Sequence, residues 1–515
     1  MLPAVCLLAS SCVSSRPPFD AGMLASRDKT PEGHSRLRAL GPLFERQEID
    51  GKTFTAVRPF YSRTVDPGNE RSLREYLWPL AMDKDFKDET FWRVLLAYGQ
   101  DFDTHDPDSR YRCILFPFVY SGRDIHDEDY FAVFPIGGKV NEFLGRDKIW
   151  FVLFPLYMYS AINDVKTYDV VWPFISWTEG GKVSSFRVFP FYGQSVKENQ
   201  WRKRFALWPI WTSARYSYPD GQAGGGFILF PLFGHSKLTD QESWMLLPPF
   251  FRWSWNDKGY RSGNSPWPFV QYSVEKGHDE KLYLWPFWGT RHNENYRSSF
   301  FLWPIGSSLE VNRVEYSLNQ FSLFPLVFYE KKTPKTGIAS QGSSASAQAA
   351  ADKDVRKPMT EGASDSPRPI SPAIAEPVEG IEVNNTTDGR YFKLWPLVSY
   401  LREGDASRVR LLDLWPGKQL GAVERNFAPL WTFYSHVRVD GAGEDELLWG
   451  LFRRSHDSRG SRHLSLFPIF SCATRPADDA REWSFLWGLT GYQREGLRKT
   501  YRVLYFLKFS TSGEK

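Results

Sequence analysis

The sequence lacks any long apolar run, although 17% of its residues are aromatic. No stretch approaches the roughly eighteen consecutive apolar residues of a membrane-spanning helix, so a helical membrane protein is excluded. This absence does not bear on a membrane β-barrel, because the strands of a barrel alternate polar and apolar residues. A strong charge imbalance is also missing, since 64 Lys and Arg oppose 60 Asp and Glu. Such a small excess does not indicate nucleic acid as a partner.

Cysteine is scarce, with Cys6, Cys12, Cys113 and Cys472 as the four examples. None of them forms a C-x-x-C pair, so the sequence indicates neither a metal knuckle nor a redox motif. We expect Cys113 and Cys472 to be inert buried thiols. A disulfide between them is the alternative, and it would require the two ends of the chain to meet in space.

Recognisable catalytic motifs are missing as well. The nine histidines are scattered, and no two of them have the close spacing of a metal-ligand pair. There is no G-x-S-x-G elbow and no phosphate-binding P-loop. The sequence therefore predicts a non-enzymatic protein with no catalytic residue, no metal and no cofactor. A carbohydrate-active protein stays open as an alternative, because the separation of two catalytic carboxylates cannot be read from a sequence.

The amino terminus carries a short apolar segment, then small residues, then Cys12. The residues Ala9-Ser10-Ser11-Cys12 resemble the lipobox that ends a bacterial lipoprotein signal peptide. This resemblance implies cleavage before Cys12, attachment of lipid to that residue and, with Val13 following it, sorting to the outer membrane. An ordinary secretion signal is the alternative, and either reading places the protein outside the cytoplasm.

One short unit recurs through almost the whole chain, at intervals of about 19 residues. It is centred on an aromatic residue followed by proline, as in Phe116-Pro117, Trp208-Pro209 and Trp303-Pro304. Apolar residues flank the pair on both sides, and polar turn residues follow. We interpret each unit as one strand of about ten to twelve residues, bent at its middle by the proline, and then a tight turn. Short turns predict antiparallel pairing.

The repeat predicts an all-β fold, an antiparallel up-and-down meander of about 22 strands. A sheet of that size must curl, split or close, and we expect closure as a large β-barrel. Stacked sheets as in a propeller and a β-solenoid are the alternatives. Because successive turns of such a meander would lie at opposite ends, the acidic turns Asp101–Asp108 and Asp124–Asp129 are expected at opposite ends of the structure.

Composition divides the chain into five segments. Residues 331–388 are rich in Ala, Ser, Pro, Lys and Glu and poor in aromatics, which is typical of disorder, and the repeat resumes after them. The predicted segments are a signal peptide with lipobox (1–12), a tether (13–38), a first part of the β-domain (39–330), a disordered insertion loop (331–388) and a second part continuous with the first (389–515).

Departures from the repeat are the candidate binding sites, because residues that recur in every unit serve the architecture. The clearest departures surround a double proline and a compressed stretch near residue 415. The candidate binding residues are Phe250, Arg252, Trp253, Trp255 and Trp415.

These observations lead to one main hypothesis of function and two alternatives. We expect a non-enzymatic lipoprotein of the bacterial cell envelope, located at the outer membrane, that acts as a β-rich scaffold or binding protein. Its partners would be the membrane, through the lipid anchor on Cys12 and through the surface of the β-domain, and an envelope glycan or protein. The alternatives are an outer-membrane β-barrel that forms a pore or export channel, and a carbohydrate-binding or carbohydrate-active protein.

Overall fold

The computed structural model describes the chain except residues 1–18, 218–220, 222, 276–278, 336–387 and 513–515. In this part of the chain, one antiparallel sheet of 46 strands contains nearly all of the regular structure. Each strand pairs with the strand before it and the strand after it in the sequence. The prediction of an all-β, antiparallel up-and-down meander is therefore confirmed.

The strands are short, and the longest ones described have eight residues. The first half of the sheet consists of β1 (Phe19–Ala21), β2 (Ala25–Lys29), β3 (Ser35–Ala39), β4 (Phe44–Ile49), β5 (Lys52–Val57), β6 (Tyr61–Asp66), β7 (Arg71–Tyr76), β8 (Ala81–Phe86), β9 (Glu89–Val94), β10 (Ala97–Asp101), β11 (Tyr111–Leu115), β12 (Val119–Arg123), β13 (Asp129–Val133), β14 (Gly137–Phe143), β15 (Arg146–Val152), β16 (Tyr157–Ile162), β17 (Val165–Val170), β18 (Ile175–Gly180), β19 (Val183–Val188), β20 (Tyr192–Lys197), β21 (Trp201–Ala206), β22 (Trp211–Ser217) and β23 (Ala223–Leu229).

The second half continues in the same way and is interrupted by two short helices. Its strands are β24 (Phe233–Leu238), β25 (Glu242–Leu246), β26 (Phe251–Trp255), β27 (Tyr260–Asn264), β28 (Val270–Glu275), β29 (Asp279–Leu284), β30 (Trp288–Asn293), β31 (Tyr296–Phe301), β32 (Gly306–Asn312), β33 (Tyr316–Leu323), β34 (Val327–Pro334), β35 (Gly389–Leu394), β36 (Val398–Glu403), β37 (Ala406–Leu411), β38 (Tyr434–Val439), β39 (Ala442–Leu447), β40 (Phe452–His456), β41 (Arg462–Leu466), β42 (Phe470–Arg475), β43 (Ala480–Phe485), β44 (Thr490–Glu495), β45 (Arg498–Val503) and β46 (Leu507–Ser512). The helices are α3 (Gly421–Asn426) and α4 (Ala428–Trp431). No helix of the described part is long and apolar enough to cross a membrane.

The aromatic–proline pairs form turns, so their interpretation as mid-strand bends is wrong. Between β21 and β22, the Trp208–Pro209 peptide bond is cis. The Ile210 amide donates to the Leu207 carbonyl at 2.7 Å, which closes a four-residue turn with proline third, as in type VI turns. Each expected strand is thus a hairpin of two strands, and the predicted count of about 22 was too low by half. Apolar residues on both sides of the pair had made the two arms resemble one strand.

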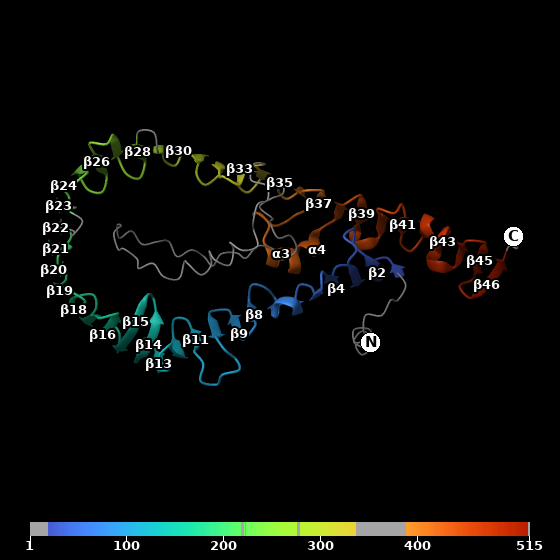
Figure 1. Ribbon diagram of the computed structural model, residues 1–515, viewed down its shortest axis with the longest axis horizontal. Coiled ribbons are helices and arrows are strands. Elements are labelled where there is room, and N and C mark those ends of the chain that lie inside the picture. The colour runs from blue at the N-terminus through green and yellow to red at the C-terminus, as the bar shows by residue number, and fades with distance from the viewer. Residues whose placement is uncertain (1–18, 218–220, 222, 276–278, 336–387, 513–515) are drawn as a thin grey trace, which may run out of the picture.

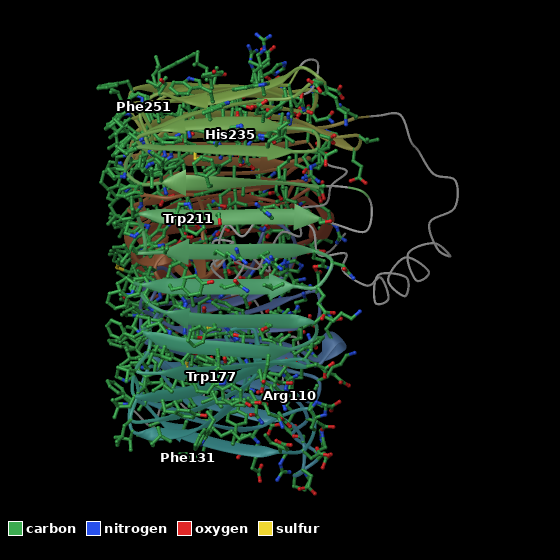
Figure 2. The ribbon with its side chains drawn as sticks, turned by 90° about the vertical axis from the view of Figure 1, so that its left-hand side faces the viewer. Arg110, Phe131, Trp177, Trp211, His235 and Phe251 are labelled. Carbon is green, nitrogen blue, oxygen red and sulfur yellow. The ribbon has the colours of Figure 1, made fainter. Side chains whose placement is uncertain are left out.

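All of these turns lie at one edge of the sheet. We call this edge the proline rim, which comprises the turns from each odd-numbered strand to the next strand. The other turns form the opposite edge, the polar rim. Figure 2 shows the two edges, with carbon-rich side chains such as Phe131 and Phe251 at the left and charged side chains such as Arg110 at the right. The sheet is therefore amphipathic along the direction of its strands.

The two acidic turns lie on the same rim, which corrects the expectation that they lie at opposite ends. Both belong to the polar rim, because an even number of short strands separates them. Arg123 links them directly, since its Nη1 contacts Asp108 at 2.8 Å and its Nε contacts Asp129 at 2.8 Å. Across the described residues, no group of three or more His, Cys, Asp and Glu could hold a metal ion.

The sheet curls into a ring (Figure 1). No backbone pairing closes it, since within the described part β1 pairs with β2 alone and β46 with β45 alone. The predicted hydrogen-bonded barrel is therefore not supported. Instead, the arm formed by β1 to β6 lies beside the arm formed by β38 to β42, and β43 to β46 extend past this contact (Figure 1). Side chains join the two arms.

Residues of each strand can be numbered by rows from the proline rim. Row 1 is the strand residue next to the proline-rim turn, row 2 is the next residue along the strand, and row 5 is four residues beyond row 1. Because successive side chains of a strand point to opposite faces, odd rows share one face and even rows share the other. Row 2 residues of the two arms, such as Arg38 and Glu446, contact one another across the ring, with Nη1 and Oε1 2.7 Å apart. Even rows therefore face the inside of the ring, and odd rows face outward.

The inner face carries both the packed core and the smallest side chains. Beneath β10 to β16, Ile114, Tyr120 and Phe151 belong to one buried apolar cluster. Along the curve at the left of Figure 1, row 4 holds small residues such as Ser195 and Gly226. Small inner side chains let adjacent strands tilt toward one another, and they leave a groove of about 870 Å³ on the concave side.

Two boundaries of the predicted segments can be compared with the strands. Strands β1 and β2 and the start of β3 lie within residues 13–38, which we had expected to form a tether. The insertion at 331–388 falls mainly outside the described residues. On either side of it, β34 and β35 pair with each other, as Val327 with Leu394, so both parts of the β-domain belong to one sheet.

Candidate functional site

The proline rim is almost free of charge. Among its short turns in the described part, the one that contains Arg58 is the exception, and the others hold no Asp, Glu, Lys or Arg. Their apolar side chains are exposed: Phe60 by 65%, Leu96 by 63%, Ile136 by 64% and Phe287 by 67%. Exposed apolar patches much larger than those of ordinary monomers mark sites of contact with protein or membrane.

The apolar character continues from the turns onto the outer face. The row 1 residues, which flank the turns, include no charged side chain. Row 3 is mainly aromatic between β13 and β36, and its rings contact one another across strands. The ring centroid of Tyr168 lies 5.1 Å from that of Tyr159 and 5.3 Å from that of Trp177. Charged residues become common at row 5, for example Lys166 and Glu179. At roughly 3.4 Å per residue, the apolar band is about 14 Å high.

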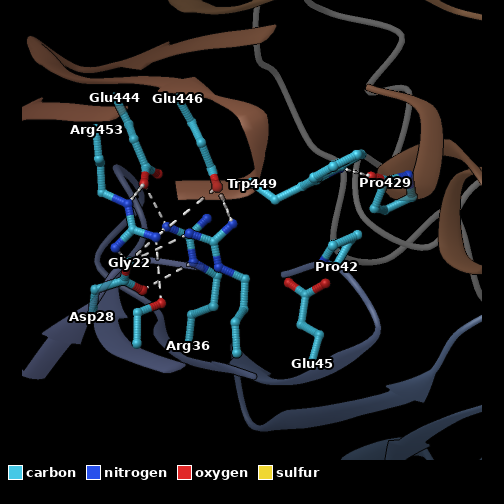
Figure 3. Close-up of polar contacts among 12 residues, drawn as sticks. Gly22, Asp28, Arg36, Pro42, Glu45, Pro429, Glu444, Glu446, Trp449 and Arg453 are labelled. Atoms are coloured by element: carbon cyan, nitrogen blue, oxygen red, sulfur yellow. Dashed lines mark hydrogen bonds and ion pairs between the residues drawn. The ribbon is translucent and has the colours of Figure 1, made fainter. Parts of the chain in front are cut away.

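A buried cluster of charges joins the two arms of the ring (Figure 3). Arg36 Nη2 contacts Glu444 Oε1 at 2.6 Å, and Arg453 Nη1 contacts Asp28 Oδ2 at 2.6 Å. These partners lie more than 400 positions apart in the sequence, as the pair Arg36 and Glu444 shows with a separation of 408. Arg453 is 3% exposed, so its charge is compensated by the carboxylates around it rather than by water.

A second contact docks helix α3 on the inner face of β6 and β7. Arg425 forms a two-pronged ion pair with Glu75, in which both nitrogen–oxygen distances are 3.0 Å. Asn426 and Ser62 also donate to Glu75, at 2.8 Å and 2.9 Å. Arg58 donates to the Arg425 carbonyl at 2.7 Å. The one charged residue among the short rim turns therefore points inward and supports the closure.

The closure carboxylates have lowered pKa values. Burial alone would raise the pKa of Asp28, but Arg36 and Arg453 together hold it well below its ordinary value. Burial opposes the shift at Glu446 in the same way, and Arg38 and Arg453 lower its pKa. These carboxylates are therefore ionised at neutral pH, and the ring is closed by charge pairs.

The structure does not bring the five predicted binding residues together. Phe250 lies on the proline rim and is 49% exposed, and Trp253 and Trp255 point outward from β26. Arg252, on the inner face of β26, donates to Ser254 at 3.2 Å.

Trp415 belongs to the connection 412–433, in which its Nε1 donates to the Lys418 carbonyl at 2.9 Å. This connection contains α3 and lies far from β26 around the ring (Figure 1). Cys12 lies outside the described residues. Cys113 and Cys472 are free thiols on β11 and β42, so the alternative disulfide is not formed. Cys113 is exposed and Cys472 is half-buried, so the prediction that both are buried is wrong.

No family model matches the chain, and no curated protein is significantly similar to it. The function must therefore be argued from the rim, the outer face and the closure.

Substitution of Gly22 is expected to push the two arms apart. Gly22 has φ +54°, and a Cβ added there would overlap the Cβ of Phe467 on the opposite arm. We expect Gly22→Ala to lower the free energy of unfolding by about 2–3 kcal/mol, of which the left-handed backbone accounts for about 1–2. It should also lengthen the distance between spin labels at positions 32 and 458, which lie on the two arms, in the polar-rim turns that follow β2 and β40.

Gly51→Ala is the matched control, because Gly51 has φ +80° in a polar-rim turn and nothing lies within 4 Å of an added Cβ. Gly51→Ala should lower the free energy of unfolding only by about 1–2 kcal/mol, which is what a left-handed backbone costs a non-glycine residue, and it should leave the label distance unchanged. Equal effects of the two substitutions would contradict the assigned contact between the arms.

The closure is expected to weaken in acid. A carboxylate with a lowered pKa stabilises the folded state above its unfolded pKa, and that stability is lost as the pH falls through the folded value. Because Asp28 and Glu446 pair with arginines of the opposite arm and have lowered pKa values, the arms should stay together at neutral pH and separate below about pH 4. The same spin-label pair, titrated from pH 7 to pH 3, measures this. A distance that stays constant over the whole range would show that the charges do not hold the arms.

Proposed function

We propose that the protein is a non-enzymatic scaffold of the bacterial cell envelope that rests on a lipid bilayer with its proline rim buried in one leaflet. The observation that carries this proposal is the uncharged edge formed by the rim turns, Arg58 apart, and by row 1, which a mainly aromatic row 3 continues between β13 and β36. Its estimated height of about 14 Å matches one half of a hydrocarbon core of about 30 Å. Trp and Tyr on the outer face suit the interface between hydrocarbon and water.

The short strands favour half-insertion over a pore. A strand that crosses a bilayer needs about 9–11 residues. The longest described strands, β33 and β34, have eight residues each, and charged residues are common in row 5. A ring that enters one leaflet with its rim buries the apolar band and keeps the charged rows in water.

Lipid attachment at Cys12 supports the same location, because a single lipid chain gives only marginal membrane binding and stable anchoring requires a second signal. The proline rim supplies that second signal. We propose the outer membrane as the location of the scaffold, because its amino terminus resembles a lipoprotein signal.

The experiment is vesicle flotation with protein in which all four cysteines are serine, so that no lipid can be attached. We expect this protein to float with phospholipid vesicles, because the rim alone provides the contact. A protein that remains at the bottom of the gradient with every vesicle composition would overturn the proposal.

A further inference from the structure

Row 5 of the outer face, directly beyond the apolar band, is strongly basic from β21 onward. Nine of its basic residues form three ladders on adjacent or nearby strands, two on the ring and one on the strands that extend past the contact between the arms (Figure 1). The ladders are Arg202, Arg215 and Lys237 on β21, β22 and β24; Lys331, Arg390 and Arg402 on β34 to β36; and Arg481, Arg494 and Lys499 on β43 to β45.

Like charges face each other directly in these ladders. Arg202 lies opposite Arg215, and Arg390 lies opposite both Lys331 and Arg402. In the third ladder, Arg494 lies opposite Arg481 on one side and Lys499 on the other. Like charges directly opposite each other destabilise a sheet. The repulsion between like charges recurs at three places in the sheet. This recurrence indicates that an anion outside the chain compensates the charges.

The chain itself supplies few counter-charges to the ladders. Arg494 pairs with Asp479 at 2.9 Å, and Arg390 lies 3.7 Å from Asp388. Lys237 lies opposite Glu242 on β25. The remaining members of the ladders have no carboxylate partner among the residues that the structure describes, and these are Arg202, Arg215, Lys331, Arg402, Arg481 and Lys499.

The position of the ladders matches the headgroup layer. Row 5 lies four residues from the turns, which is about 14 Å along the strand. When the rim fills the hydrocarbon of one leaflet, whose half-thickness is about 15 Å, these side chains reach the level of the lipid phosphates. The long stems of Lys and Arg can lie along the apolar band while their charges reach the headgroups.

We propose that the three basic ladders bind the phosphate-bearing headgroups of anionic lipids, so that the ring selects negatively charged membrane. This inference rests on the proposed function, because the ladders reach lipid phosphates only when the proline rim is inserted. Contacts at three separate places along the sheet also keep the polar rim facing away from the bilayer.

Flotation with two vesicle compositions tests the proposal. The vesicles are phosphatidylcholine alone, and phosphatidylcholine with about 30% phosphatidylglycerol. A basic residue near an anionic surface contributes about fivefold in affinity. We therefore expect at least about 20-fold tighter binding to the anionic vesicles.

The variant carries Arg202→Gln, Arg215→Gln, Arg390→Gln and Arg402→Gln. Because the third ladder on β43 to β45 remains, this variant should lose most but not all of the preference for anionic vesicles, while its binding to phosphatidylcholine alone stays unchanged. The control carries the same change of charge on the polar rim, with Lys182→Gln, Lys258→Gln, Arg313→Gln and Arg459→Gln, and should keep the preference for anionic vesicles. Circular dichroism establishes that both variants are folded.

The outcomes separate this inference from the proposed function. Equal binding of the unsubstituted protein to the two compositions would overturn the inference and leave rim insertion standing. An equal loss of preference in the variant and the control would also overturn it, because net charge and not the ladders would then be responsible. A failure to bind either composition would overturn both proposals.

Discussion

Aspartate placed on the proline rim is expected to release the protein from membranes. Phe287 and Ile305 are 67% and 45% exposed on adjacent rim turns, so Phe287→Asp and Ile305→Asp should leave the fold intact. In hydrocarbon, each new carboxylate costs about 2 kcal/mol, which is roughly a 30-fold loss of affinity. The double variant should therefore bind neutral vesicles roughly a thousandfold more weakly in a titration of lipid against fixed protein.

The polar rim offers a matched control. Leu144 and Leu497 are 79% and 56% exposed in turns of the opposite edge. Leu144→Asp with Leu497→Asp introduces the same two charges on apolar surface that stays in water, so affinity for vesicles should be unchanged. A loss of binding in this control as large as that in the rim variant would mean that the orientation of the ring on the bilayer is wrong.

Removal of Arg453 is expected to open the ring. Its guanidinium lies between Asp28 at 2.6 Å and Glu444 at 3.6 Å, and it is 3% exposed. Arg453→Met leaves Asp28 and Glu444 with Arg36 as their remaining shared partner, and loss of one member of a buried charge cluster typically costs about 3–5 kcal/mol. We expect the free energy of unfolding in urea to fall by about that amount, and the distance between spin labels at positions 32 and 458 to lengthen.

The neighbouring residue on β40 is the control, because Arg454 points outward and is exposed. Arg454→Met should change the free energy of unfolding by less than about 1 kcal/mol and leave the label distance unchanged. If Asp28→Asn is added to Arg453→Met, part of the lost stability should return, since one uncompensated charge is then removed. An Arg453 variant as stable as the unsubstituted protein would show that the cluster does not hold the arms together.

The repeat made most of the architecture predictable from the sequence. The recurrence of pairs such as Trp208-Pro209, with polar turn residues between them, was enough to predict one continuous antiparallel meander. It did not distinguish a bend from a turn, because apolar residues flank the pair on both sides. That symmetry arises because both arms of each hairpin belong to the apolar band. The period was therefore correct, and its division into strands was wrong.

The closure could not be predicted, because its partners are brought together only by the curvature of the whole sheet. Nothing in the sequence relates Arg36 to Glu444 across 408 positions. One signal was available: Arg58 takes the place that Trp or Phe occupies before most rim prolines. A basic residue at a position otherwise reserved for aromatics indicates an inward partner, which proved to be the Arg425 carbonyl.

The residues of the proline rim could be recognised in the sequence, but the surface that they form together could not be predicted. The candidate residues were sought as departures from the repeat, and Phe250 and Trp415 lie far apart in the ring. The repeated turns themselves form the continuous apolar edge. Each repeat adds only a few residues to the proline rim, and the sequence does not show that all of the turns lie on one edge. The repeated residues were therefore interpreted as structural and not as a binding surface.

The depth of the proline rim in a bilayer is the most direct test of its insertion into one leaflet. A nitroxide attached at position 305, on the proline rim, can be compared with one at Asn295, on the polar rim of the same strand β31. With the protein bound to vesicles, electron paramagnetic resonance measures collisions of each label with oxygen and with a water-soluble nickel complex. We predict that the label at 305 lies in hydrocarbon, about 14 Å below the phosphates and within one leaflet, while the label at 295 stays in water. Equal exposure of both labels to the nickel complex would contradict the insertion of the proline rim into the bilayer.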